Sequence, residues 1–164
     1  KLFGLKRVLW LENGHLLGDD TDAHIDTVAR FCDENTIAYV QCTDENEIHY
    51  TDLKKMETEL QQFKTLDNKP YQLIPLPMAD AIYAEDDKRR LPATYANFLI
   101  MNDVVLMPTY EVPQDELAIT QLQKAFPAKK VVGVDCRALL LQHGSLHCIT
   151  MQYPKGSIKL GNSH

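Results

Sequence analysis

Hydrophobic and polar positions along the first half of the chain predict two strands, a helix and a third strand. The β-branched and aromatic runs His24–Cys32 and Thr36–Cys42 flank a polar turn, as the strands of a hairpin do. Apolar residues recur at helical spacings of three and four between about residues 51 and 64, namely at Leu53, Met56, Leu60 and Phe63. Tyr71–Ile74 is then a short strand, which the prolines that follow it are expected to close.

The same order of elements returns from Leu91 onward. Asn97–Met101 and Val104–Met107 read as a hairpin around an Asn-Asp turn. A helix is predicted from about residue 113 to 126, because a proline opens it and acidic residues occupy its first turn. Lys130–Val134 closes the unit as a strand, and a third copy is expected to start at Leu146.

The chain therefore predicts an α/β fold built from repeated ββαβ units, spaced by roughly 70 residues. One such unit cannot cover both faces of its own sheet, so neighbouring units must bury it. Two units and the start of a third make an incomplete ring. The chain also begins without methionine and enters an apparent strand at Arg7–Leu11. We therefore expect it to be part of a longer protein.

Composition narrows the classes of function. The net charge is −6, from 17 basic and 23 acidic residues, which argues against a nucleic-acid-binding protein. No apolar run reaches membrane-spanning length, so no membrane segment is predicted. The four cysteines form no CxxC pair, which argues against a zinc ribbon or a thioredoxin-type site. A chain of this length does not need disulfides, and a reducing cytoplasm is the expected compartment.

The candidate functional residues lie in three segments, residues 18–26, 91–98 and 142–152, each at the start of a unit. In a ring these segments would point at a shared centre. His24 and Asp26 lie two apart at the head of a predicted strand, so their side chains would share one face. Such a pair can act in acid–base catalysis, with the carboxylate orienting the ring or binding a cation. The alternatives are a polar strand start, or a metal loop, although the calcium-loop spacing is absent.

Cys148 lies where a glycine-containing turn enters a predicted strand, so its thiol can stay accessible. Cys32, Cys42 and Cys136 fit inert, buried positions better. A reactive thiol needs a lowered pKa or a cationic neighbour. Adjacent strand residues point to opposite faces, which makes His24 a better base for Cys148 than His147. A zinc site from these three residues would lack the usual paired spacing of ligands.

These segments carry a resemblance to a known family. WLENGHLLGDDTDAHID, LPATYANF, FPAKKVVGVDCRALL and HGSLHCITMQYP resemble, in this order, segments of the agmatine deiminase and Porphyromonas-type peptidylarginine deiminase family. The match begins at the middle of the family. It implies a partial pentein, an α/β propeller of ββαβ units, with residues 1–164 as the C-terminal part of a deiminase catalytic domain. Residues 142–145 read QHGS where most agmatine deiminases have GGGN, which leaves the substrate open.

The resemblance implies Cys148 as nucleophile, His24 as proton donor and then activator of water, and Asp26 as binder of a guanidinium group. It implies that Asn97, Tyr95 and Trp10 line the substrate pocket, although Trp10 also suits ordinary core packing. Neither metal nor organic cofactor is implied.

The expected reaction converts agmatine to N-carbamoylputrescine and ammonia, in polyamine synthesis, with peptidyl or free arginine as the alternative substrate. The resemblance also implies a further catalytic carboxylate in the family's first half, which has no equivalent segment here, so an N-terminal half of the same protein is an expected partner. A second class of function is a non-catalytic fragment that associates with itself as a homodimer through open strand edges.

Overall fold

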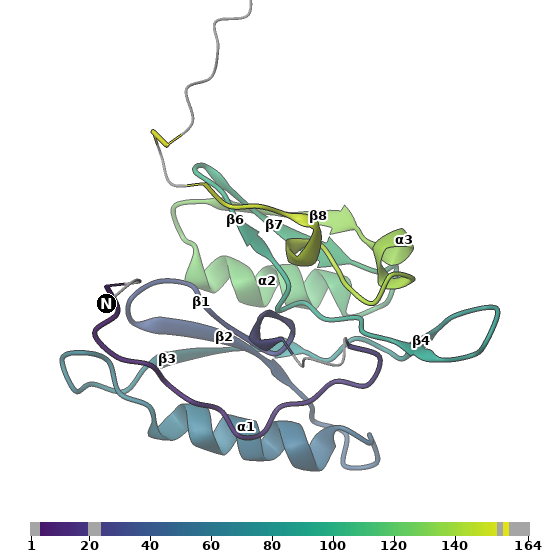
Figure 1. The fold of residues 1–164 in the computed structure, drawn as a ribbon, viewed down its shortest axis with the longest axis horizontal. Coiled ribbons are helices and arrows are strands. Elements are labelled where there is room, and N and C mark those ends of the chain that lie inside the picture. Colours follow the sequence, from purple (N-terminus) through teal and green to yellow (C-terminus); the bar gives the residue numbers. More distant parts are fainter. Residues whose placement is uncertain (1–3, 20–23, 154–155, 158–164) are drawn as a thin grey trace, which may run out of the picture.

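The computed structural model describes residues 4–19, 24–153 and 156–157, and contains two β-β-α-β units joined by a hairpin (Figure 1). The first unit consists of β1 (Ala29–Phe31), β2 (Thr36–Gln41), α1 (Tyr50–Gln62) and β3 (Gln72–Pro77). The hairpin consists of β4 (Ile82–Tyr83) and β5 (Arg90–Leu91). The second unit consists of β6 (Leu99–Ile100), β7 (Val104–Thr109), α2 (Asp115–Ala125) and β8 (Lys130–Asp135). Three short helices, η1 (Ile25–Thr27), α3 (Arg137–Leu140) and η2 (His147–Ile149), complete the described elements.

The two units share one topology, which confirms the predicted repeat. β1 pairs with β2 antiparallel, and β2 pairs with β3 parallel. β6, β7 and β8 repeat this arrangement, with β6 antiparallel and β8 parallel to β7. In each unit the helix forms the crossover that a parallel pair of strands requires.

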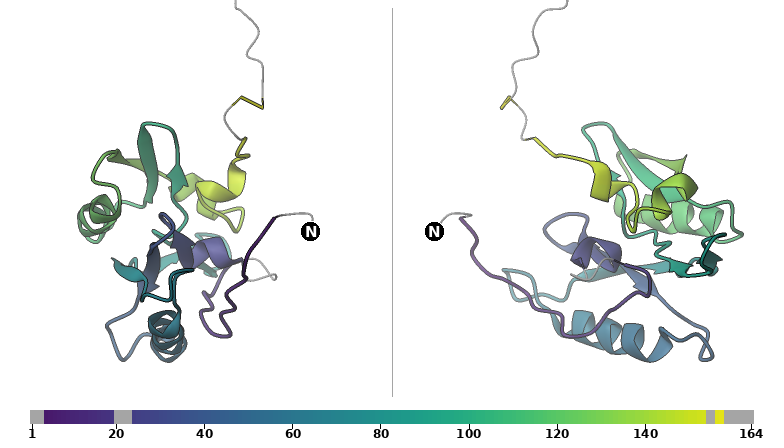
Figure 2. Two further views of the ribbon diagram at one scale, coloured as in Figure 1. Left: turned by 90° about the vertical axis from the view of Figure 1, so that its left-hand side faces the viewer. Right: turned by 45° about the vertical axis from the view of Figure 1, so that its right-hand side comes forward.

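The units stack in layers, in the order α1, first sheet, α2, second sheet (Figures 1 and 2). α2 packs on β3 of the first unit as well as on β8 of its own. Ala118 and Leu122 of α2 are consequently fully buried. Complete burial of a leucine side chain contributes about 1.5–3 kcal/mol, so α2 is a main link between the units. No helix in the described residues is long and apolar enough to cross a membrane.

The strand predicted at His24–Cys32 is wrong over its first half, where η1 replaces it. The hydroxyl of Thr27 lies 2.7 Å from the carbonyl oxygen of His24, and the Thr27 N–H donates to the same oxygen. Such local bonds of a threonine compete with sheet pairing and close a tight turn instead. His24 and Asp26 are therefore not alternate residues of a strand.

Two other strand predictions also fail. Residues 7–11 form no strand, because the segment lies across α1 and its neighbouring N–H groups find carboxylates there (Figure 1). Gly14 N and His15 N donate to Asp52 of α1, at 2.9 and 2.7 Å. The expected strand after Leu146 is the helix η2.

β3 runs further than predicted, through Pro75 and Pro77. The sheet order is β1-β2-β3, so β3 is an edge strand. An edge strand tolerates proline because its outward N–H groups have no strand partner to lose.

A buried histidine ties the N-terminal segment to the first unit. His49 is buried, its Nε2 accepts the N–H of Leu17 at 2.9 Å, and its Nδ1 lies 2.7 Å from Glu47 Oε1. Glu47 also binds Arg90 at 2.7 Å. Accepting from Leu17 requires an unprotonated Nε2, so this network needs the neutral imidazole. Burial lowers the pKa of His49 below its ordinary value of 6.5.

We predict that His49 makes the free energy of unfolding fall as the pH drops below about 6.5. Below that pH the unfolded chain binds a proton that the folded chain excludes, so stability present at higher pH is lost. One proton gives a slope of at most about 1.4 kcal/mol per pH unit. Urea unfolding between pH 7.5 and 5 measures it, with His49→Gln as the non-titrating control. An unchanged slope in His49→Gln would contradict the assignment.

Candidate functional site

The side chain of Asn97 joins two distant segments of the chain into one cluster. Asn97 has no solvent exposure. Its Nδ2 donates to Asp26 Oδ2 at 3.1 Å and to the Asp26 carbonyl oxygen at 3.2 Å. Its Oδ1 accepts the backbone N–H groups of His147 at 2.7 Å and Cys148 at 3.3 Å. One buried amide thus sets the position of η1 relative to η2.

Asp26 and His147 form a second link between the same segments. His147 Nδ1 lies 2.6 Å from Asp26 Oδ2. An ionised carboxylate can only accept, so Nδ1 carries the proton, and in the neutral ring Nε2 is left as an acceptor. The sequence analysis disfavoured His147 as a base for Cys148 because it assumed a strand, in which adjacent side chains point to opposite faces. That assumption is wrong, because residues 147–149 are helical and His147 pairs with Asp26.

Cys148 is the exposed cysteine among the four. Its Sγ lies 3.5 Å from Asn97 Oδ1. Burial raises the pKa of the Cys32 thiol to about 12, and burial also raises the pKa values of Cys42 and Cys136. These three thiols are thus poorly ionised, as expected of inert cysteines. Accessibility separates Cys148 from them, as the sequence predicted.

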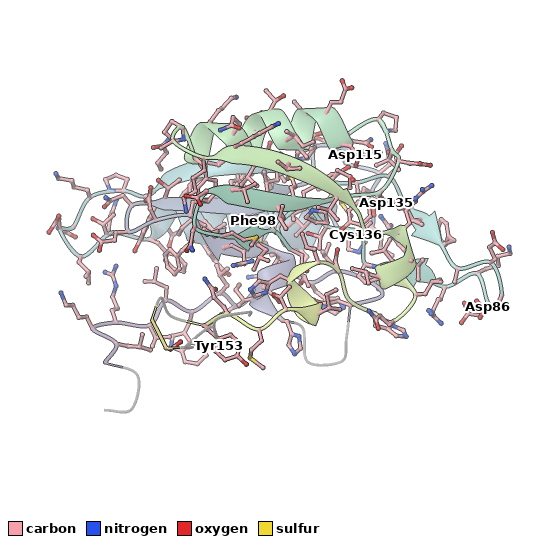
Figure 3. The ribbon with its side chains drawn as sticks, turned by 90° about the horizontal axis from the view of Figure 1, so that it is seen from above. Asp86, Phe98, Asp115, Asp135, Cys136 and Tyr153 are labelled. Atoms are coloured by element: carbon pink, nitrogen blue, oxygen red, sulfur yellow. The ribbon has the colours of Figure 1, made fainter. Side chains whose placement is uncertain are left out.

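Arg30 is a charged residue near the cluster that the sequence analysis missed. Its guanidinium lies 4.9 Å from the centre of the Phe98 ring and donates to the Phe98 carbonyl oxygen. Phe98 lies inside the body of the protein (Figure 3). Burial lowers the pKa of Arg30, and the negative charge of Asp26 opposes this change. Arg30 thus places a cation near the Asp26 carboxylate. Its sequence signal is a charge within the apolar run VARFC.

The structure leaves two predicted pocket residues out of the cluster. Tyr95 is completely buried and its hydroxyl donates to Asp115 Oδ1, in α2, at 2.6 Å, so it belongs to the core. Trp10 is 78% exposed, so it is not part of the core of the described residues. His24 immediately precedes η1 and is exposed. The structure therefore joins Asp26, Asn97 and Cys148, and adds His147.

An apolar groove of about 1000 Å³ opens beside the cluster. Asp26, Arg30 and His147 form part of its wall, together with residues 4–9 and the exposed side chains of Ile25 and Phe31. Phe31 belongs to β1, the open edge of the first sheet. No group of three or more potential metal ligands occurs among residues 4–19, 24–153 and 156–157. Of the Asp-rich loop, Asp20 and Asp22 lie outside these residues.

The fold is that of the agmatine deiminase and peptidyl-arginine deiminase structures, which are pentein-fold enzymes. The chain belongs to the Porphyromonas-type peptidyl-arginine deiminase family, whose model matches residues 1–154. This confirms the family resemblance and the predicted α/β fold of repeated ββαβ units.

Three similar proteins illustrate the range of the family. A protein from Marinomonas sp. (strain MWYL1) named "Putative agmatine deiminase" is 35% identical, over 95% of this chain and 46% of its own length. A crystal structure of the "Putative Arginine Deiminase" from Porphyromonas gingivalis is 56% identical with a TM-score of 0.89, over 93% of this chain and 44% of that one. A C. jejuni agmatine deiminase with substrate bound is 48% identical with a TM-score of 0.79, over 89% and 41%. The chain thus spans less than half the length of these relatives.

We predict that Asn97→Asp destabilises the fold most at neutral pH. The substitution is nearly isosteric, but it replaces the donor to Asp26 by a second carboxylate. Losing a buried hydrogen-bond partner costs about 1–3 kcal/mol, and the repulsion between carboxylates adds to this. Acidification should reduce the loss, because one carboxylate then takes up a proton. Urea unfolding at pH 7 and pH 4 measures the difference. Exposed Asn102→Asp serves as control, and a loss independent of pH would contradict the account.

We predict that Gly144→Ala impairs Cys148 more than it impairs the fold. An added Cβ at Gly144 would lie 3.0 Å from Cys148 Cβ and 3.5 Å from its Sγ, so the cysteine must shift. The rate of Cys148 modification by a haloacetamidine should fall roughly tenfold, because such reactions depend steeply on placement. Gly133→Ala is the control, since its Cβ would crowd Thr109, away from Cys148, at 2.8 Å. Equal effects of both variants on the rate would contradict this assignment.

Proposed function

We propose that this chain is the C-terminal part of a hydrolase that deiminates a guanidinium group through a covalent adduct with Cys148. The observation that carries the proposal is the buried Asn97 amide, which gathers an accessible thiol, a histidine and a carboxylate at one place. Family membership supports the same reaction class. A thiol supplies the nucleophile, and the carboxylate supplies the counter-charge for a cationic substrate.

The reaction proceeds in two displacements. The Cys148 thiolate attacks the guanidinium carbon and forms a C–S bond. The C–N bond to one terminal nitrogen breaks, and a protonated histidine supplies the proton with which ammonia leaves. Water then attacks the same carbon and gives one proton to that histidine, and the C–S bond breaks to restore the thiolate. The second proton of the water passes to the released ammonia, which becomes ammonium. The sum is guanidinium plus water giving a urea and ammonium, without redox change or cofactor.

Asp26 is proposed to bind the guanidinium, whose planar N–H groups match a carboxylate. Both side-chain hydrogen bonds of Asp26, from Asn97 and from His147, end on Oδ2. A substrate can thus pair with Oδ1 without breaking the cluster. The positive charge of the bound substrate favours the thiolate form of Cys148. His24 is proposed as the acid and base, and His147, oriented by Asp26, is the alternative.

Agmatine, hydrolysed to N-carbamoylputrescine and ammonia in the synthesis of putrescine and polyamines, is the first proposed substrate. The names of the Marinomonas and C. jejuni relatives favour it. Peptidyl or free arginine, giving citrulline, is the second, favoured by the family description and by the 56% identity to the P. gingivalis protein. Both reactions suit a cytoplasmic enzyme that binds no nucleic acid.

The apolar groove beside Asp26 is proposed to receive the N-terminal half of the same protein. Relatives are more than twice as long as the matched region, and the groove exposes Ile25 and Phe31 at the edge of the first sheet. An apolar surface of this kind favours a protein partner over solvent. In this arrangement the other half would supply the further carboxylate and the pocket for the distal end of the substrate. A homodimer through the same edge is the alternative, in which the chain alone is not catalytic.

We predict that ammonia release from agmatine requires Cys148. Release is measured for this chain, alone and mixed with the N-terminal half, with Cys148→Ser as the test and Cys32→Ser as the matched control. Turnover should appear in the mixture and vanish in Cys148→Ser, while Cys32→Ser retains it. Blocked arginine run in parallel decides between the two substrates. Turnover that survives Cys148→Ser would contradict the mechanism.

The same assay assigns the base. His24→Gln should remove turnover, and His147→Gln should reduce it by misplacing Asp26. If instead His147→Gln abolishes turnover and His24→Gln retains it, the base is His147.

A further inference from the structure

Four buried hydroxyl side chains lie next to the catalytic cluster without belonging to it. They come from η1, from the segment before β6, from the end of β7 and from the loop before η2, and we refer to them as the hydroxyl cluster: Thr27, Thr94, Tyr110 and Ser145. Each is at most 3% exposed. Buried hydroxyl groups must be hydrogen-bonded to offset the loss of water, so the bonds that these four side chains make are structurally demanding.

The hydroxyl of Tyr110 is the centre of this cluster. It donates to the carbonyl oxygen of Thr94 at 2.8 Å and accepts the N–H of Thr94 at 3.1 Å. It also lies 2.8 Å from Ser145 Oγ. A phenol has one proton, and the Thr94 carbonyl can only accept it. Ser145 is therefore the donor in its bond with Tyr110, and all the capacity of the phenol is used.

Each neighbour of Tyr110 leads to a residue of the catalytic cluster. Thr94 lies three residues before Asn97, and Ser145 lies three residues before Cys148. The hydroxyl of Thr94 donates to the carbonyl oxygen of Thr27 at 2.5 Å, and Thr27 directly follows Asp26. The hydroxyl cluster thus links the same three segments as Asn97 does, by separate bonds.

Tyr110 itself is fixed from the opposite side by the helix α2. Its backbone N–H donates to both carboxylate oxygens of Asp115, at 3.2 and 3.1 Å. Its ring packs against Tyr95 with centroids 5.6 Å apart. Asp115 is the first residue of α2 and lies at the end of that helix (Figure 3). Tyr110 therefore connects α2, through its backbone N–H, to the segments that carry Asn97 and Cys148, through its hydroxyl.

We infer that Tyr110 is a positioning residue for the deiminase reaction, whose hydroxyl sets the separation between the Asn97 segment and the Cys148 segment. The inference rests on the proposed function, but the bonds that it invokes exist whatever the substrate. A displacement of about 1 Å in a catalytic group can cost about a hundredfold in rate, which is why a residue remote from the substrate can matter.

The test compares Tyr110→Phe with Tyr39→Phe. Tyr39 is also a buried tyrosine, and its hydroxyl donates to Glu57 Oε1 at 2.6 Å in the first unit, away from the catalytic cluster. Both variants lose one buried hydroxyl, so both should lower the melting temperature. Only Tyr110→Phe should disturb the site. Ser145→Ala and the double variant with Tyr110→Phe complete a double-mutant cycle, in which effects through one shared bond are not additive.

Two readouts separate the inference from the proposed function. The first is the ratio of Cys148 labelling rates with 2-chloroacetamidine, a cation, and iodoacetamide, which is neutral. Tyr110→Phe and Ser145→Ala should each lower this ratio roughly tenfold, and the double variant no further. The second is the NMR resonance of the His147 Nδ1 proton bound to Asp26, which should broaden or shift in Tyr110→Phe and stay in place in Tyr39→Phe.

The outcomes are distinct. If Tyr110→Phe keeps both the ratio and the resonance of the wild type while melting earlier, Tyr110 is merely structural and the inference is overturned. If the wild-type ratio is no higher for Cys148 than for Cys32, the proposed function fails. The resonance then decides on Tyr110 alone.

Discussion

The site depends on one constraint, which is that the Asn97 amide is buried and must satisfy its hydrogen bonds within the protein. Its donor side reaches Asp26 and its acceptor side reaches the backbone of His147 and Cys148. A buried amide left without these partners costs a large fraction of the stability of a small domain. The hydrogen bonds of Asn97 therefore require that the Asp26 and Cys148 segments come together in the folded protein. The carboxylate and the thiol cannot separate without exposing or orphaning Asn97.

The layered repeat explains why such distant residues meet. In both units the segment that precedes the first strand carries site residues, Asp26 in one and Asn97 in the other. Stacking through α2 brings these equivalent segments together, and the loop before η2 then adds His147 and Cys148. The hydrogen bonds that join the three segments lie beside the apolar groove, whose wall includes Asp26 and His147. The repeated units form the scaffold, and the candidate site residues lie in the segments at the start of each unit.

Much of this arrangement could be predicted from the sequence, because a strong periodicity of apolar residues indicates the type of element that the segment forms. The helical spacing of Leu53, Met56 and Leu60 predicted α1 within two residues at each end. The exposed Cys148 was distinguished from the buried Cys42 and Cys136 and the half-buried Cys32 by its place after a glycine turn. What failed depended on tertiary partners. The segment 7–11 is extended but pairs with no strand, and β3 tolerates two prolines only because it lies at an edge.

The segments that the structure brings together were easier to predict than the contacts between their residues. Asp26 and Asn97 were expected near Cys148, and they are joined to it. The bond between Asp26 and His147 could not be foreseen, since it requires η1 and η2 to be helical where strands were expected. Tyr95 was expected in the pocket, but Asp115 holds its hydroxyl in the core. Local pattern thus identified the segments, whereas the direction of each side chain was set by bonds across long sequence separations.

The central claim is that Cys148 becomes covalently bonded to the guanidinium carbon during turnover. The most direct measurement is mass spectrometry of the two halves mixed, quenched in acid while agmatine is being consumed. The account predicts a Cys148 peptide heavier by agmatine less ammonia, with Cys32, Cys42 and Cys136 unmodified. Ammonia release with the Cys148 peptide unmodified at every quench time and in the presence of slow substrates, or an adduct on another cysteine, would contradict it.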